Sequence, residues 1–201
     1  MKAGDEFIGV ILAAGASQRM GFPKWQAEIA GKSFLAHIVD TFAEVNITSP
    51  IVVFRKFPDS IHKSIIPVIN PSPESGQLSS LQTALGLTDD QRPFFMQLVD
   101  RPLVHHSTFT MMMDEYDGSK IVIPAFEGRK GHPVLFPPGM KKVIMRTDLK
   151  GGTRAAIEMW SGGVRIVETG DEAVLWNIDT AAQIRHYSKL IEDDSRGNYE
   201  Y

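Results

Sequence analysis

The sequence predicts an α/β fold: a single-domain, three-layer sandwich around a mostly parallel, Rossmann-like sheet. Short apolar runs alternate along the chain with stretches whose apolar residues recur every three or four positions, which is typical of alternating strands and helices. The apolar runs are nearly continuous, as expected for strands that helices cover on both faces. A length of 201 residues suits one domain. We expect that domain over residues 7–190, with an acidic, frayed tail over 191–201.

Seven strands are expected, and each is a short run dominated by β-branched and aromatic residues. In chain order they cover residues 7–12, 51–54, 65–69, 94–99, 121–123, 133–136 and 164–167. Ser33 is positioned to cap a helix over 34–42, and leucines at helical spacing mark a second helix over 78–85. Thr153 is positioned to cap a third helix, and a fourth is expected over 180–190.

Composition excludes several classes of protein. The formal net charge is −3, so the chain lacks the basic field that a nucleic-acid partner requires. The absence of cysteine excludes disulfide scaffolds, thiol catalysis and cysteine metal sites. The charged N-terminus does not resemble a signal peptide, and no apolar run is long enough to span a membrane. We therefore expect a cytoplasmic protein with neither a nucleic-acid nor a membrane partner.

The segment after the first strand reads Leu-Ala-Ala-Gly-Ala-Ser-Gln-Arg-Met-Gly-Phe-Pro-Lys over residues 12–24. It is neither a Walker A loop nor a dinucleotide fingerprint. Its small residues let the backbone approach a ligand and direct N–H groups at phosphate oxygens, and its two cations add positive charge. The alternative is a tight turn with two solvated cations. The candidate phosphate-binding residues are Leu12, Ala13, Ala14, Gly15, Ser17, Arg19 and Lys24.

Two later segments also follow predicted strands, where an α/β sheet places its ligands. Residues 70–81 form a proline-rich loop that enters a helix, either as a plain turn with capping hydroxyls or as a pocket for a base and a ribose. The candidates there are Asn70, Gly76, Ser79 and Ser80. Asp100 ends the fourth strand, where a carboxylate is costly unless it is paired or binds a metal. It could cap a helix, pair with Arg101 or bind Mg²⁺.

Residues 12–24 resemble the signature loop of the MobA-like nucleotidyltransferases, in particular the molybdenum cofactor cytidylyltransferases. Four more segments are similar to family motifs and follow in the family's order, so the resemblance covers about residues 7–190. They are Asn-Pro and Gly-x-x-x-Ser within 70–80, Asp-x-Pro at 100–102, Gly-His-Pro at 131–133 and Asn-Ile-Asp-Thr at 177–180. The chain departs from the family at 181–183, where Ala-Ala-Gln stands in place of the usual Pro-Glu-Asp.

The resemblance implies roles for individual residues. Arg19, Lys24 and Asp100 would be catalytic, with Asp100 as a ligand of Mg²⁺ or, alternatively, Mn²⁺. Asp179 would be a second metal ligand, although it could instead cap the helix that follows. The segment over 70–80 would lie against the nucleotide base. The acceptor substrate would contact His132, Arg154 and Asn177.

The reaction implied by the resemblance is transfer of a nucleoside monophosphate to a phosphate-bearing acceptor, with release of pyrophosphate. Ala-Ala-Gly in the loop favours CTP over GTP, since guanylyl relatives typically read Ala-Gly-Gly. The acceptor would be molybdopterin bearing molybdenum, and the product could be delivered to a molybdoenzyme or its chaperone. The alternatives are a guanylyltransferase, a sugar-1-phosphate nucleotidyltransferase, a metal-dependent glycosyltransferase and a non-catalytic nucleotide-binding module.

Overall fold

The computed structural model describes residues 6–17, 19–58, 63–88, 91–146 and 151–196, with the side chains of 192–196 excepted. An eight-stranded sheet forms its centre, in the order β10-β7-β9-β6-β1-β4-β5, with β8 paired to β7. Its strands are β1 Ile8–Ala13, β4 Ile51–Phe54, β5 Ile66–Ile69, β6 Phe94–Leu98, β7 Ile121–Phe126, β8 Arg129–Lys130, β9 Val134–Phe136 and β10 Val164–Glu168. A separate hairpin pairs β2 Glu28–Ile29 with β3 Lys32–Ser33. All seven predicted strands are present, so the predicted fold class is confirmed.

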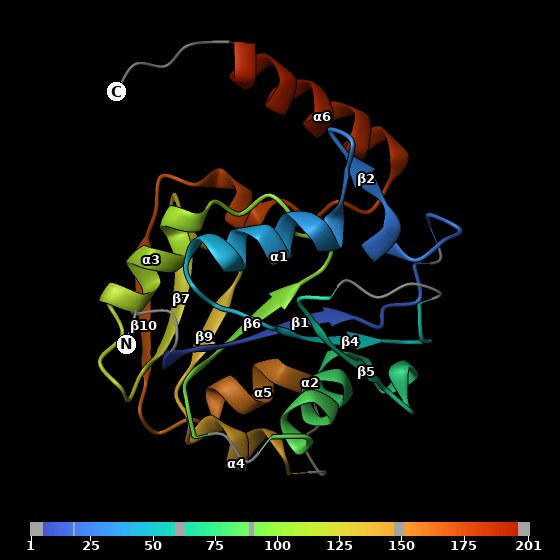
Figure 1. Ribbon diagram of the computed structural model, residues 1–201. Coiled ribbons are helices and arrows are strands. Elements are labelled where there is room, and N and C mark those ends of the chain that lie inside the picture. The colour runs from blue at the N-terminus through green and yellow to red at the C-terminus, as the bar shows by residue number, and fades with distance from the viewer. Residues whose placement is uncertain (1–5, 18, 59–62, 89–90, 147–150, 197–201) are drawn as a thin grey trace.

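Helices cover both faces of the sheet, as Figure 1 shows. On one face lie α1 Phe34–Glu44 and α3 His106–Asp114, and α6 Ala181–Arg196 lies beyond α1 beside the β2–β3 hairpin. On the other face lie α2 Gly76–Gly86, α4 Met140–Ile144 and α5 Gly152–Glu158. Each face has its own apolar cluster, because alternate residues of a strand point to opposite sides of the sheet.

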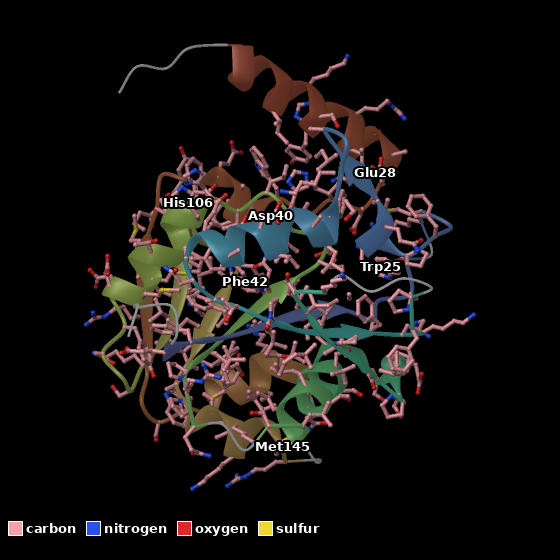
Figure 2. The ribbon with its side chains drawn as sticks, viewed as in Figure 1. Trp25, Glu28, Asp40, Phe42, His106 and Met145 are labelled. Carbon is pink, nitrogen blue, oxygen red and sulfur yellow. The ribbon has the colours of Figure 1, made fainter. Side chains whose placement is uncertain are left out.

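Helix α1 illustrates how sequence determines local structure. Ser33 is its N-cap, and its hydroxyl accepts a hydrogen bond from the Ala36 N–H, as predicted. Phe42 points from α1 toward the sheet (Figure 2) and packs against Gly9 of β1. A Cβ at Gly9 would lie 2.7 Å from the Phe42 ring, so this strand position accommodates a close approach of the helix.

Two predicted helix boundaries need correction, and the structure also gives the direction of β9. Helix α5 begins at Gly152 after Gly151 in the left-handed region (φ 94°), so Thr153 lies inside the helix and is not its cap. Strand β9 runs antiparallel to both β6 and β7. Helix α6 continues six residues past Leu190 to Arg196, and residues 197–201 of the expected tail lie outside the described residues. No described helix combines the length and apolar character needed to cross a membrane.

Strands β6, β1 and β4 are parallel, and their registers bring their carboxyl ends to one edge of the sheet. Leu12 pairs with Leu98, and Ala13 pairs with Phe54. The chain leaves β1 toward β4 and β5 on one side and returns to β6 on the other, so this edge is a topological switch point. Such points are where open α/β sheets bind ligands.

Candidate functional site

The loop after β1 is held in shape by Ser17. The Ser17 hydroxyl accepts a hydrogen bond from the Lys24 backbone N–H at 3.0 Å. The Ser17 carbonyl accepts two more, from Met20 and Gly21 at 3.0 and 3.2 Å. Ser17 has a positive φ of 50°, which few residues other than glycine adopt. The loop therefore folds back on itself and brings Lys24 to the edge of the sheet.

Lys24 begins the short 3-10 helix Lys24–Gln26, which an aromatic contact anchors to the sheet. The ring of Trp25 meets the ring of Phe54, the last residue of β4, edge-on at a centroid distance of 5.4 Å. Figure 2 shows Trp25 on this side of the molecule, next to the β2–β3 hairpin. Because Trp25 is fixed against β4, its neighbour Lys24 is directed toward the ends of β1 and β6.

The Lys24 ammonium joins two carboxylates that lie far apart in the sequence. Lys24 Nζ donates to Asp100 Oδ2 at 2.9 Å and also contacts Asp179 Oδ1. Arg19 adds a second cation, with its Nη1 3.0 Å from Asp179 Oδ2. Segments from the beginning, middle and end of the chain thus converge on one charged centre of two cations and two carboxylates.

Electrostatics keep this centre ionised. Burial alone would lower the pKa of Lys24, but hydrogen bonds to Asp100 and Asp179 outweigh it and raise the pKa above its ordinary value. Burial likewise opposes ionisation of Asp179, yet Lys24 and Arg19 hold the pKa of that carboxyl below its ordinary value. Both groups therefore carry full charge at neutral pH.

Asp179 does not cap α6. Thr180 has that role: its hydroxyl accepts from the Gln183 N–H, and the Gln183 side chain accepts from the Asp179 N–H at 2.9 Å. The Asp179 carboxylate is thereby left to face Lys24 and Arg19. The neighbouring Ile178 N–H donates to the Asp100 carbonyl at 2.8 Å and ties the two carboxylate segments together.

Asp100 neither caps a helix nor forms an ion pair with Arg101. His105 caps the helix that follows, and the ion-pair partner of Asp100 among the described residues is Lys24 rather than Arg101. The second carboxylate oxygen, Asp100 Oδ1, is buried without a hydrogen-bond partner. An unpaired buried carboxylate oxygen is costly, so this atom is available for a further ligand.

A cavity of about 590 Å³ opens beside this centre at the carboxyl ends of β1 and β6. The small residues of the signature loop form one wall, and the start of α2 forms another. Its lining residues include Leu12, Ala13, Ala14, Gly15, Ser17, Lys24, Gly76, Ser80 and Asp100. The structure thus brings together most of the residues expected to bind the nucleotide, from three separate segments.

Three of the predicted nucleotide-binding residues do not line this cavity: Arg19, which lies in the charged centre, and Asn70 and Ser79. Asn70 is buried, and its amide donates to Ser80 Oγ at 3.0 Å while its Oδ1 accepts from Ser79 and from the Ser72 N–H. These bonds hold the proline-rich loop against the first turn of α2. Asn70 and Ser79 shape the wall of the cavity from behind.

The three residues expected to contact the acceptor are divided between two places. His132 and Arg154 line a second cavity of about 500 Å³, together with Arg101, Lys130 and Thr153. Arg154 is largely exposed, and its Nε pairs with Glu158 Oε1 one helical turn away at 3.1 Å. Asn177 lies elsewhere, where its amide donates to Asp179 Oδ2 at 3.1 Å, so its described contact is with the charged centre.

His132 is a neutral side chain in a buried setting. Burial and, to a smaller extent, the nearby Arg101 charge together lower its pKa from 6.5 to about 4, against the opposing effect of the Met96 carbonyl that accepts from the ring. Its Nδ1 has no hydrogen-bond partner. The ring therefore offers a hydrogen-bond acceptor beside the second cavity rather than a positive charge.

This burial predicts a pH-dependent stability. The unfolded chain binds a proton at His132 more readily than the folded protein, so stability is complete above about pH 6.5 and falls as the pH drops toward about 4. Between pH 7 and pH 5 the free energy of unfolding should fall by about 2 kcal/mol from this residue. Urea unfolding at both pH values should show that His132→Gln removes this difference. His186→Gln, at an exposed histidine of α6, should retain it, and an unchanged difference in His132→Gln would contradict the buried neutral ring.

The lining residues that were not predicted from the sequence include an arginine and a glutamine. Arg55 directly follows β4, lines the nucleotide cavity, and donates from Nε to the Ala14 carbonyl at 3.2 Å. Gln77 lies in the first turn of α2 and lines both cavities. The signal for Arg55 was its place after a strand, the same position that indicated Asp100. For Gln77 the sequence held no comparable signal.

The charged centre fits a hard divalent cation. Asp100 and Asp179 converge on a single ammonium, and Asp100 Oδ1 lacks a partner. The described residues contain no group of three or more histidines and acidic residues placed to hold a metal. A cation bound here would thus take one or two carboxylates from the protein and its other ligands from phosphate and water, the pattern that Mg²⁺ favours.

Comparison with curated proteins finds relatives at low identity. The bifunctional protein GlmU of Paraburkholderia phymatum is 28% identical over 152 residues, which is 72% of this chain but only 34% of GlmU. A protein of Bacillus cereus named a probable molybdenum cofactor guanylyltransferase is 27% identical over 139 residues, 65% of this chain and 67% of that protein. The chain therefore spans about a third of one relative and two thirds of the other.

Solved structures share the fold. A 4-diphosphocytidyl-2C-methyl-D-erythritol synthase from Anaerococcus prevotii has a TM-score of 0.75 at 17% identity, covering 94% of this chain and 98% of that one. A manganese complex of Rv0371c from Mycobacterium tuberculosis has a TM-score of 0.69 at 20% identity, covering 91% and 98%. The family model for the MobA-like NTP transferase domain matches residues 9–166, a span that holds the signature loop, Lys24, Asp100 and both cavities. The chain accordingly belongs to the MobA-like NTP transferase family.

Proposed function

We propose that this protein transfers CMP from CTP to a phosphate-bearing acceptor, molybdopterin bearing molybdenum, and releases pyrophosphate. The observation that carries the proposal is the contact of Lys24 with both Asp100 and Asp179 at the mouth of the cavity formed by the signature loop. A triphosphate in this cavity would have its phosphates beside two cations and a pair of potential metal ligands. The whole active domain would span residues 7–190.

The chemistry requires charge compensation and alignment rather than a general base. An acceptor phosphate is already anionic at neutral pH, so one of its oxygens can attack the α-phosphorus without losing a proton. Lys24 and Arg19 would stabilise negative charge on the triphosphate and on the departing pyrophosphate. The backbone of Gly15 and the hydroxyl of Ser80 line the cavity and would orient the nucleotide.

Asp100 and Asp179 would hold the divalent cation, Mg²⁺ or Mn²⁺. When bound, this cation would offset the negative charge of the phosphates, which otherwise repels the nucleophile. Lys24 now occupies the space between the two carboxylates, so cation binding requires its ammonium to move toward the phosphates. The acceptor would occupy the second cavity, in contact with His132 and Arg154.

The choice of base rests on residue 14. Ala14 lines the nucleotide cavity, where its methyl group reduces the room for a purine relative to glycine. A cytidylyl-type enzyme is among the proteins that share the fold, which accords with CTP. A second candidate, guanylyl transfer from GTP, is favoured by the name of the Bacillus cereus relative. The two candidates share all the chemistry and differ in the base.

Thermal stabilisation by CTP, GTP, ATP and UTP, each with and without Mg²⁺, tests the proposal directly. A ligand at a hundred times its dissociation constant adds about 2.7 kcal/mol to the free energy of unfolding, enough to raise the melting midpoint visibly. We expect a rise that is selective for CTP and depends on Mg²⁺. A rise selective for GTP would establish the guanylyl candidate, and no rise with any triphosphate would contradict nucleotidyl transfer by this chain.

A further inference from the structure

The nucleotide cavity and the second cavity share a lining residue, and the region around that residue is termed the junction. Gln77 lines both of them, and the adjacent residues Asp100 and Arg101 line one each. In the proposed function, the α-phosphate lies on the Asp100 side and the body of the acceptor lies on the Arg101 side. The attacking phosphate belongs to the acceptor but must also approach the α-phosphate, because reacting atoms have to lie about 3–3.5 Å apart. It must therefore occupy this junction.

Arg101 is an unusual cation for such a position. Its guanidinium is partly buried, and its Nη1 donates to the Val174 carbonyl at 3.0 Å, whereas its Nε is buried without a partner. Among the described residues it forms no ion pair, and the two nearest acidic partners, Asp100 and Asp179, are held by Lys24. A partly buried charge whose neighbouring carboxylates are paired with another cation is costly in a folded protein unless a ligand adds opposite charge.

The Val174 carbonyl fixes the position of Arg101 relative to the second cavity. The same carbonyl also accepts the His132 backbone N–H at 3.0 Å, so it joins Arg101 to the turn that carries His132. The Arg101 carbonyl accepts from Gln97 on β6. The Val174 carbonyl thus holds the guanidinium near the turn that carries His132, and Gln97 holds the Arg101 backbone.

Gln77 lines the second cavity together with Arg101 and complements it chemically. Its side chain is exposed, and none of the described residues forms a hydrogen bond with its amide. A glutamine amide donates hydrogen bonds without adding charge. Arginine and glutamine together offer charge-assisted and neutral donors to one group of oxygens.

We propose, as an extension of the proposed function, that Arg101 and Gln77 bind the attacking phosphate of the acceptor. One phosphate oxygen forms a bond to the α-phosphorus, the bond from the α-phosphorus to the bridging β-phosphate oxygen breaks, and pyrophosphate leaves with that electron pair. The remaining oxygens of the nucleophile stay on Arg101 and Gln77. The acceptor class is therefore a phosphate monoester. Such a group carries a second negative charge, which the partly buried Arg101 guanidinium would neutralise.

The experiment uses the full chain saturated with a non-hydrolysable CTP analogue and Mg²⁺, so that the nucleotide cavity is filled. Inorganic phosphate is then titrated as a probe of the junction, and binding is followed by calorimetry. We expect Arg101→Met to weaken phosphate binding about tenfold or more, the loss typical of a charge-assisted hydrogen bond. Arg101→Lys should restore part of it, and Gln77→Ala should weaken it severalfold. Arg165→Met, at a cation that pairs with Glu115 on the far side of the sheet, is the matched control.

Binding of the CTP analogue distinguishes failure of the proposed function from failure of the roles assigned to Arg101 and Gln77. If the analogue does not bind the wild-type protein, the proposed function fails and this inference fails with it. If the analogue binds all variants alike and phosphate binds Arg101→Met as tightly as wild type, this inference alone is overturned. In steady-state transfer, Arg101→Lys should raise KM for the acceptor and leave KM for CTP within about twofold, so it carries the test if Arg101→Met does not fold. An equal rise in both KM values would indicate a merely structural role and would also overturn the inference.

Discussion

Lys24→Met lowers turnover at least about a hundredfold, judged from the loss of comparable electrostatic groups in other enzymes. Methionine keeps the length and apolar stem of lysine but removes the ammonium that contacts Asp100 and Asp179. The variant therefore lacks the charge that would stabilise the triphosphate in the transition state. Pyrophosphate release under saturating CTP and acceptor measures the effect, and near-normal turnover would contradict the catalytic assignment.

The same variant should bind a divalent cation at least as well as the wild-type protein. In the structure the ammonium lies between the two carboxylates and would have to leave before a metal could bind. Its removal leaves two facing carboxylates whose mutual repulsion a cation relieves. Electron paramagnetic resonance of Mn²⁺ without nucleotide measures this directly. Lys32→Met, at an exposed lysine that pairs with Asp40, is the matched control and should change neither turnover nor Mn²⁺ binding.

Much of the fold could be predicted because strands that are buried on both faces appear in the sequence as nearly continuous apolar runs. The run over residues 7–12 and the run over 94–99 are almost wholly apolar, and both became central strands. The direction of β9 could not be predicted, since its apolar residues read the same in either orientation. The start of α5 was misplaced because a threonine near a helix is a common cap, whereas the left-handed Gly151 that precedes the helix allows it to begin earlier.

The candidate site was less predictable than the fold, for a physical reason. Lys24 was predicted from its place in the loop after the first strand, and Asp100 from its place at a strand end. Nothing in their spacing shows that they touch across 76 positions. The strand order, with β1 between β4 and β6, creates that contact and also brings Arg55 to the cavity. Arg101 occupies the variable position between the two fixed residues of the Asp-x-Pro motif, so the motif assigns it no role. Its unpaired burial becomes evident only when the chain around Val174 is in place.

Asp100→Asn and Asp179→Asn should each lower turnover at least about a hundredfold and weaken Mn²⁺ binding. An amide keeps the shape of the carboxylate but loses the charge that a hard cation requires. Mn²⁺ titration and Mn²⁺-dependent turnover should be measured on both variants, with Asp40→Asn as control because Asp40 is a half-exposed carboxylate on the outer face of α1 (Figure 2).

The two variants also distinguish two roles for Asp179. Asp179 contacts both Lys24 and Arg19, whereas Asp100 contacts Lys24 and has an oxygen without a partner. If both carboxylates hold the cation, the two variants lose Mn²⁺ binding to a similar extent. If Asp179 instead orients Lys24, its variant loses turnover but keeps Mn²⁺ binding, and the metal is then held by Asp100 and the phosphates alone. The second result would remove Asp179 from the metal site and leave Lys24 as the group through which it acts.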